Sequence, residues 1–178
     1  MRPIHPRPVD HPMATDRPQS TFQRVSCAAV AVALGLTAAL PARADTPFSA
    51  LAGSWSGGGQ IRLEDGKSER LSCRAIYNPK ESGVTLGMSL RCASTSYKIE
   101  LRSSLRYDGG QVSGSWEERT FNAGGAVSGK ATNGTIQLSF SGNISGSMSV
   151  SYGGASQRVS LTTSGSGLSG LSLNLSKG

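Results

Sequence analysis

Hydrophobic and polar residues alternate along most of the chain from residue 54 onward. In the clearest run, 144–152, apolar residues such as Ile144, Met148 and Val150 share one face, and serines occupy the other. Because successive side chains of a β-strand point to opposite faces, a period of two predicts strands with one apolar and one polar side. Gly, Asn and Asp interrupt the pattern about every eight to twelve residues, which indicates short strands joined by tight turns.

The alternation and its interruptions predict an all-β fold. A short turn is expected at 47–51, and the predicted strands lie near 54–63, 69–77, 84–93, 97–107, 111–120, 125–132, 135–141, 144–152, 157–163 and 168–176. Eight to ten strands with hairpin-length links favour an antiparallel up-and-down β-barrel, which pairs its own edges. A β-sandwich is the alternative.

One hairpin register follows from its turn. The glycines at 109–110 suit a two-residue type I′ turn, in which both central residues need positive φ. This register places Arg102 opposite Glu117 and Glu100 opposite Arg119 on the polar face. We therefore expect two cross-strand ion pairs there.

Glu118 is left without such a partner. Alternation puts it on the face of Trp116, opposite Leu101, with no cation of matching parity nearby. An unpaired carboxylate inside a barrel is costly. Two hypotheses remain: Glu118 lies in water at the barrel mouth, or it orients a ligand.

The N-terminal residues 1–44 are predicted to be a signal peptide. Several arginines precede an apolar run from Val25 to Leu40, and the segment ends in Ala42-Arg43-Ala44, which favours cleavage after Ala44. Translation starts at Met1 or at Met13. Residues 45–178 are then one β-barrel domain, and we expect a periplasmic or secreted protein.

Cys73 and Cys92 are the cysteines outside that segment. A pair in an exported chain predicts a disulfide. If the two residues face each other directly, their hairpin is centred between Ser82 and Gly83, which are typical turn residues.

Composition argues against several function classes. Both histidines, His5 and His11, lie in the predicted signal peptide, so histidine catalysis and histidine metal sites are not expected in the barrel. Adjacent Glu117 and Glu118 point to opposite faces and cannot flank one glycosidic bond. We therefore predict a non-enzymatic protein with no catalytic residues, no metal and no cofactor.

Charge and strand length bear on the partners. Part of the net charge of +7 belongs to the signal peptide, and no basic run is interleaved with aromatics, so no nucleic-acid partner is expected. Most of the predicted strands are short for an outer-membrane barrel, and the C-terminal Leu175-Ser-Lys-Gly lacks a final aromatic residue. We expect no stable membrane insertion.

The interior of the barrel is the candidate binding site. A small apolar ligand would lie in the lumen between Trp55 and Trp116, with Glu118 as a polar contact. Lumen-facing glycines such as Gly57 and Gly114 are expected to leave space for it. The alternative is an envelope protein with a purely structural role, whose side chains fill the core, as in many small barrels.

Residues 48–55, FSALAGSW, carry a family resemblance. A short turn leading through Gly53 and Trp55 into the first strand resembles the entry to calycin barrels, which are lipocalin-like. Taken whole, residues 47–178 are similar to a family of small exported proteins of alphaproteobacteria such as the rhizobia. The resemblance implies a calycin-like barrel and no particular activity.

A second resemblance rests on Leu51, Gly53 and Trp55. The same Leu-x-Gly-x-Trp entry, a small barrel and one disulfide are similar to the periplasmic inhibitors of metalloproteases. In that family the segment before the barrel enters the protease cleft. The resemblance thus implies a protease partner for residues 45–50 as an alternative function.

Overall fold

A computed structural model describes residues 46–178 of the chain. The predicted signal peptide lies outside the described residues. A short 3-10 helix, η1 (Ser49–Leu51), is followed by ten strands. Their bounds are β1 (Gly53–Leu63), β2 (Ser68–Lys80), β3 (Thr85–Ala93), β4 (Lys98–Asp108), β5 (Gln111–Glu118), β6 (Ala123–Thr132), β7 (Thr135–Gly142), β8 (Ser145–Gly153), β9 (Ser156–Ser164) and β10 (Leu168–Lys177); a second 3-10 turn, η2 (Glu81–Gly83), joins β2 to β3.

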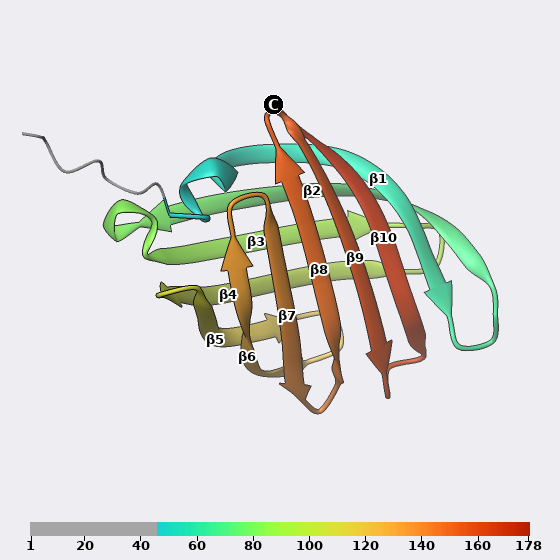
Figure 1. Ribbon diagram of the computed structural model, residues 1–178. Helices are drawn as coiled ribbons and strands as arrows, with labels where there is room; N and C mark the ends of the chain where they lie inside the picture. Colours follow the sequence, from blue (N-terminus) through green and yellow to red (C-terminus); the bar gives the residue numbers. More distant parts are fainter. Residues whose placement is uncertain (1–45) are drawn as a thin grey trace, which may run out of the picture. The chain divides into compact units, whose positions relative to one another are not determined.

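The strands form a closed antiparallel barrel. Each strand pairs with its neighbours in the sequence, and β10 returns to pair with β1, as Figure 1 shows. Closure leaves no strand edge free for pairing with another chain. The up-and-down barrel and all ten predicted strands are confirmed, and the β-sandwich alternative is wrong.

Two hairpin registers predicted from the sequence are also confirmed. Arg102 faces Glu117 and Ser103 faces Trp116 across β4 and β5, and the glycines at 109–110 both have positive φ, as a type I′ turn requires. Cys73 faces Cys92 across β2 and β3. Turn geometry therefore determined which residues of these hairpins lie opposite each other.

The predicted ion pairs on the β4–β5 hairpin are wrong. Among residues 46–178 the salt bridges are Lys67 with Asp65 and Arg106 with Glu81. Arg102 and Glu117 are both exposed, although they lie opposite each other. An exposed pair gains little from holding two long side chains in one geometry, so register alone does not bring the charges together.

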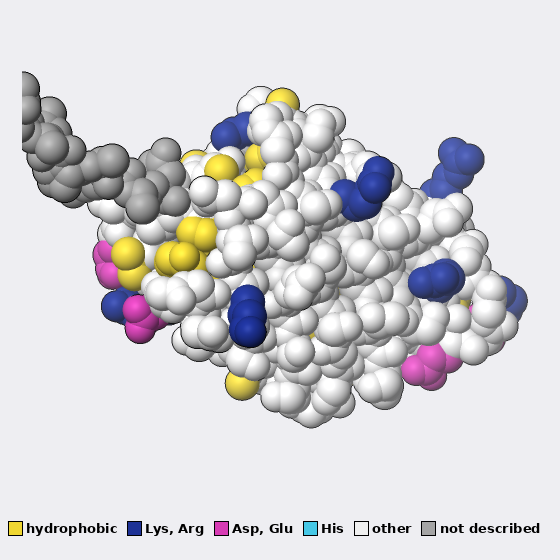
Figure 2. All heavy atoms as spheres, in the orientation of Figure 1, with side chains coloured by type: hydrophobic (Ala, Val, Ile, Leu, Met, Phe, Trp, Pro, Cys, Tyr) yellow, Lys and Arg dark blue, Asp and Glu magenta, His cyan; other side chains and the backbone are white. Residues whose placement is uncertain are grey.

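Apolar side chains of alternate residues fill the barrel, and small polar side chains coat much of its outside. On β8, Met148 and Val150 point inward, while Ser147 and Ser149 are exposed. The face toward the viewer in Figure 2, where β7, β8 and β9 lie in Figure 1, carries scattered Lys and Arg among uncharged polar groups. The period of two in the sequence thus separates the lumen from the solvent-facing coat.

The segment before β1 packs against one end of the barrel. Phe48 and Leu51 are buried, and the indole Nε1 of Trp55 donates a hydrogen bond of 2.7 Å to the Leu51 carbonyl oxygen. The hydroxyl of Tyr152 donates to the Pro47 carbonyl oxygen at 2.8 Å. These contacts tie the short predicted turn to strands from both halves of the chain and close this end.

The glycines at inward positions of the alternation have a different role from the one expected, since Gly57 and Gly114 are both exposed and neither lines the cavity described below. A Cβ atom added to Gly114 would collide with the carbonyl oxygen of Ser104 on β4, and one added to Gly57 would collide with that of Asn174 on β10. Strands that approach this closely have no room for a side chain there. These glycines permit the sharp coiling of a small closed barrel, and the expectation that they leave space for a ligand is wrong.

No helix within residues 46–178 is both long enough and apolar enough to cross a membrane.

Candidate functional site: an apolar cavity in the barrel

A cavity of about 150 Å³ runs inside the barrel. Side chains from most of the strands line it, and nearly all of them are apolar. The apolar lining residues include Leu86, Leu90, Leu101, Leu138, Met148 and Leu161. The lumen is therefore incompletely filled, and the unfilled part suits an apolar molecule.

The two ends of the cavity differ. Leu51 of η1 lines the closed end. At the opposite end the lining includes Tyr97 and Phe121 from two turns, with ring centroids 6.4 Å apart, and Phe121 is 54% exposed. Ile144 and Leu168, both half-buried, also belong to this rim. A molecule would thus enter between aromatic and aliphatic side chains at the end away from η1.

Several polar side chains also line this apolar lumen, among them Tyr77, Ser103 and Gln157. The Tyr77 hydroxyl of β2 donates a hydrogen bond of 3.0 Å to Oε1 of Gln157 on β9. Gln157 is only 3% exposed, and its Nε2 has no hydrogen-bond partner among the described residues. The hydroxyl of Ser103, in the middle of β4, is likewise buried without a partner in this part of the chain.

The Tyr77 hydroxyl remains neutral over the physiological range. Burial raises the pKa of Tyr77 to about 12, because the charged phenolate would lose its hydration. Tyr77 therefore acts as a neutral donor and acceptor in the lumen.

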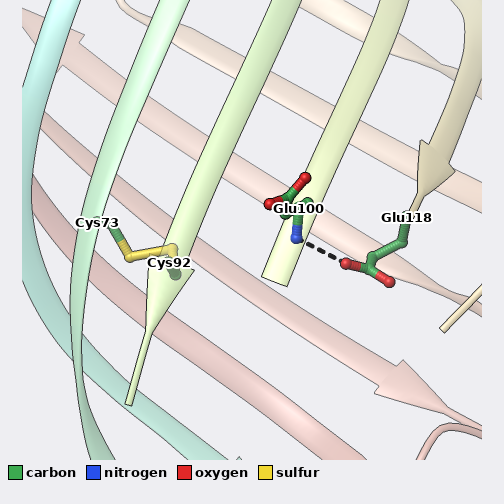
Figure 3. The surroundings of a disulfide bond; sticks show 4 residues. All are labelled: Cys73, Cys92, Glu100 and Glu118. Carbon is green, nitrogen blue, oxygen red and sulfur yellow. Dashed lines mark hydrogen bonds between the residues drawn. A yellow bond between two sulfur atoms is a disulfide. The ribbon is translucent and has the colours of Figure 1, made fainter. Parts of the chain in front are cut away.

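Glu118 lies at the open end, where its carboxylate binds backbone rather than a cation. Its Oε1 accepts a hydrogen bond from the Glu100 amide and its Oε2 accepts one from the Phe121 amide, each at 2.7 Å. Figure 3 shows the side chain reaching from β5 to the backbone of β4. Glu118 is 8% exposed and lines the cavity. Backbone amides therefore satisfy the Glu118 carboxylate in place of a cation.

The two tryptophans occupy different environments. Trp116 is half-buried, lines the cavity and packs edge-to-face on Phe140 with ring centroids 5.5 Å apart. Trp55 is 1% exposed, lies outside the cavity lining and supports η1. The structure therefore brings Trp116 and Glu118 to one cavity and separates Trp55 from it.

The predicted disulfide between Cys73 and Cys92 is present, near the open end of the barrel where Glu118 lies. The Sγ atoms of Cys73 and Cys92 are 2.07 Å apart, and the bond joins neighbouring strands β2 and β3 (Figure 3). Both cysteines belong to the buried core. The disulfide thus reinforces the wall of the lumen.

Sequence reasoning missed the polar groups of the lumen. Tyr77 and Gln157 are 80 residues apart, and each occupies an inward position of its own strand. The available signal was parity: Gln157 shares a face with apolar Val159 and Leu161, and Ser103 shares one with Leu101. A polar residue at an inward position marks a group that needs a partner inside the barrel.

Comparisons with known proteins add a likeness of fold. No protein-family model matches the sequence, and no curated protein matches it. Among solved structures, the chain is similar to Rv2717c from M. tuberculosis, with a TM-score of 0.58 and 15% identity, over 73% of this chain and 94% of that one. The likeness concerns the fold alone.

A second similar structure is the S-type phycobiliprotein lyase CPES from Guillardia theta. It has a TM-score of 0.50 and 13% identity, over 72% of this chain and 87% of that one. Like the first, this likeness concerns the barrel fold alone.

Proposed function

We propose that this protein is an exported, non-enzymatic barrel that binds a small, neutral, apolar molecule in its lumen. The observation that carries the proposal is the apolar cavity of about 150 Å³, whose lining reaches the surface at the rim around Phe121. An engineered apolar cavity of about this volume in another protein binds benzene. The predicted signal peptide at residues 1–44 and the Cys73–Cys92 disulfide support the exported location.

The size of the cavity limits the ligand. Typical pockets for drug-sized molecules have volumes of roughly 300–1,000 Å³, and this cavity is smaller. Flexible Met88 and Met148 line it, and methionine adapts readily to a ligand's shape. We therefore expect a compact ligand, about the size of a substituted benzene ring, rather than a long-chain lipid.

The side chains facing the lumen also support binding without catalysis. The one carboxylate among the cavity-lining residues is that of Glu118, and both of its oxygens accept backbone hydrogen bonds. Glu117 is exposed on the outer face, so the two adjacent glutamates do not form a pair across a bound molecule.

Native mass spectrometry and calorimetry test the proposal. Protein purified from the periplasm should carry a discrete extra mass in the native spectrum that is lost on denaturation, or should bind α-methylstyrene when titrated as a small apolar probe. Ser103→Leu would occupy part of the cavity and should weaken binding of the probe at least tenfold. Ser104→Leu is the matched control, because Ser104 is exposed on the same strand.

The proposal fails under two outcomes. One is a wild-type protein that carries no extra mass and does not bind the probe, which would favour an envelope barrel with a structural role. The other is equal weakening of probe binding by Ser103→Leu and Ser104→Leu, which would place the probe outside the lumen.

A further inference from the structure

The Tyr77–Gln157 pair lies inside the lumen, toward the end that η1 closes. Gln157 pairs in register with Leu175 of β10 and with Tyr152 of β8, and Tyr77 pairs with Gly53 at the start of β1. Both side chains line the cavity together with Leu51. A molecule that enters from the opposite rim would therefore meet this pair with its leading end.

The pair has an unused donor. The Tyr77 hydroxyl saturates one acceptor site of Gln157 Oε1, but the two N–H donors of Gln157 Nε2 have no acceptor among the described residues. Gln157 is almost fully buried, so its amide group cannot be satisfied by solvent at the surface. A buried donor without an acceptor is costly and normally has a partner in the functional state.

The surroundings restrict the charge of that partner. Within the described lining no Lys or Arg is present, and the one acidic residue, Glu118, lies at the far rim. An anionic ligand would lose its hydration in an apolar lumen with no cation to pair with. A neutral oxygen acceptor avoids this cost and still accepts from an amide N–H.

We infer that the ligand carries a neutral carbonyl oxygen, as in a ketone, ester or amide, which accepts a hydrogen bond from Gln157 Nε2 at the closed end while its apolar part fills the lumen toward Trp116. This inference rests on the proposed function and adds the chemical class and the orientation of the ligand.

Three probes with the same number of non-hydrogen atoms test it. Acetophenone has the carbonyl, α-methylstyrene replaces the carbonyl oxygen by a CH₂ group, and benzoate is an anion of similar shape. Their affinities for the wild type, Gln157→Met and Leu138→Met should be measured by calorimetry. Comparing the ratio of two affinities between variants cancels the different hydration of the probes.

Gln157→Met should weaken the binding of acetophenone about tenfold relative to the binding of α-methylstyrene, because one neutral hydrogen bond is lost in a desolvated site. Leu138→Met alters the lining without removing a donor and should leave the ratio unchanged within about twofold. Benzoate should bind the wild type at least tenfold more weakly than acetophenone.

A second measurement does not depend on the folding of a variant. In wild-type protein, the side-chain NH₂ resonances of Gln157 in a ¹H–¹⁵N spectrum should shift downfield on addition of acetophenone and much less on addition of α-methylstyrene.

The outcomes separate the two levels of the proposal. If no probe binds the wild type, the proposed function itself fails. Suppose that acetophenone and α-methylstyrene both bind, that the ratio of their affinities is unchanged by Gln157→Met, and that the Gln157 amide resonances respond equally to both. The proposed function then stands, and the inferred ligand class is overturned. Benzoate binding as tightly as acetophenone would likewise overturn the requirement for a neutral ligand.

Discussion

Replacing Glu118 by glutamine tests how the open end of the barrel is held together. The Glu118 carboxylate accepts hydrogen bonds of 2.7 Å from the Glu100 and Phe121 amides, and so joins β4 to the turn that follows β5. Glutamine has one acceptor oxygen, so one amide would lose its acceptor and face an NH₂ donor. Losing one charge-assisted bond and weakening the other should lower the free energy of unfolding by about 2 to 4 kcal/mol.

Glu117→Gln provides the matched control. It makes the same chemical change one residue earlier, at an exposed position, and should alter the free energy of unfolding by less than about 0.5 kcal/mol. In urea unfolding, Glu118→Gln should shift the midpoint down by about 1 to 2 M for an m-value of about 2 kcal/mol/M. Hydrogen exchange at the Glu100 and Phe121 amides should accelerate in this variant alone.

The affinity for α-methylstyrene identifies which role Glu118 has. If its carboxylate acts on the backbone, folded Glu118→Gln protein should bind the probe within about threefold of wild type. The reasoning is refuted if both glutamate variants unfold at the same urea concentration while only Glu118→Gln loses the probe. That result would support the ligand-orienting role considered from the sequence.

Two further predictions concern the wall of the barrel. Replacing Cys73 and Cys92 together by alanine should lower the free energy of unfolding by about 3 kcal/mol in the chain-entropy model, given their sequence separation of 19; a urea midpoint equal to that of the oxidised wild type would contradict this estimate. For Tyr77, burial raises the pKa above its ordinary value of 10.0 to about 12, so the folded state retains a proton that the unfolded state releases between these pH values. The free energy of unfolding of the wild type, relative to that of Tyr77→Phe, should therefore be constant below about pH 10 and fall by about 2 kcal/mol as the pH rises to 12. If urea titrations show that this difference between the two proteins does not change with pH, the hydroxyl is not buried.

Much of the fold could be predicted because its signals are local. A period of two in residue type distinguishes inward from outward positions within each strand. The glycines at 109–110 determine which residues of β4 and β5 lie opposite each other, and a direct Cys73–Cys92 pairing agrees with a turn centred between Ser82 and Gly83. Strand pairing between sequence neighbours depends on such short-range information, so the residue pattern was enough to predict the strands and the β4–β5 register.

The candidate site depended on contacts that parity does not specify. The sequence identified Glu118 as a carboxylate without a matching cation, and the structure shows that its partners are two backbone amides. Every residue type except proline has a backbone N–H, so no sequence pattern indicates which amides will bind the carboxylate. The glycines at inward positions were identified, yet their role depends on how closely neighbouring backbones approach after the barrel has closed.

The contents of the lumen depend on contacts that form only when the barrel closes. Tyr77 and Gln157 are 80 residues apart on strands that are not adjacent, and they meet because closure through β1 and β10 brings both to one end of the interior. The cavity of about 150 Å³ is the difference between the volume enclosed by ten strands and the summed volume of the inward side chains. A small difference between two large volumes cannot be obtained from alternation, whereas alternation suffices to determine which side chains face inward.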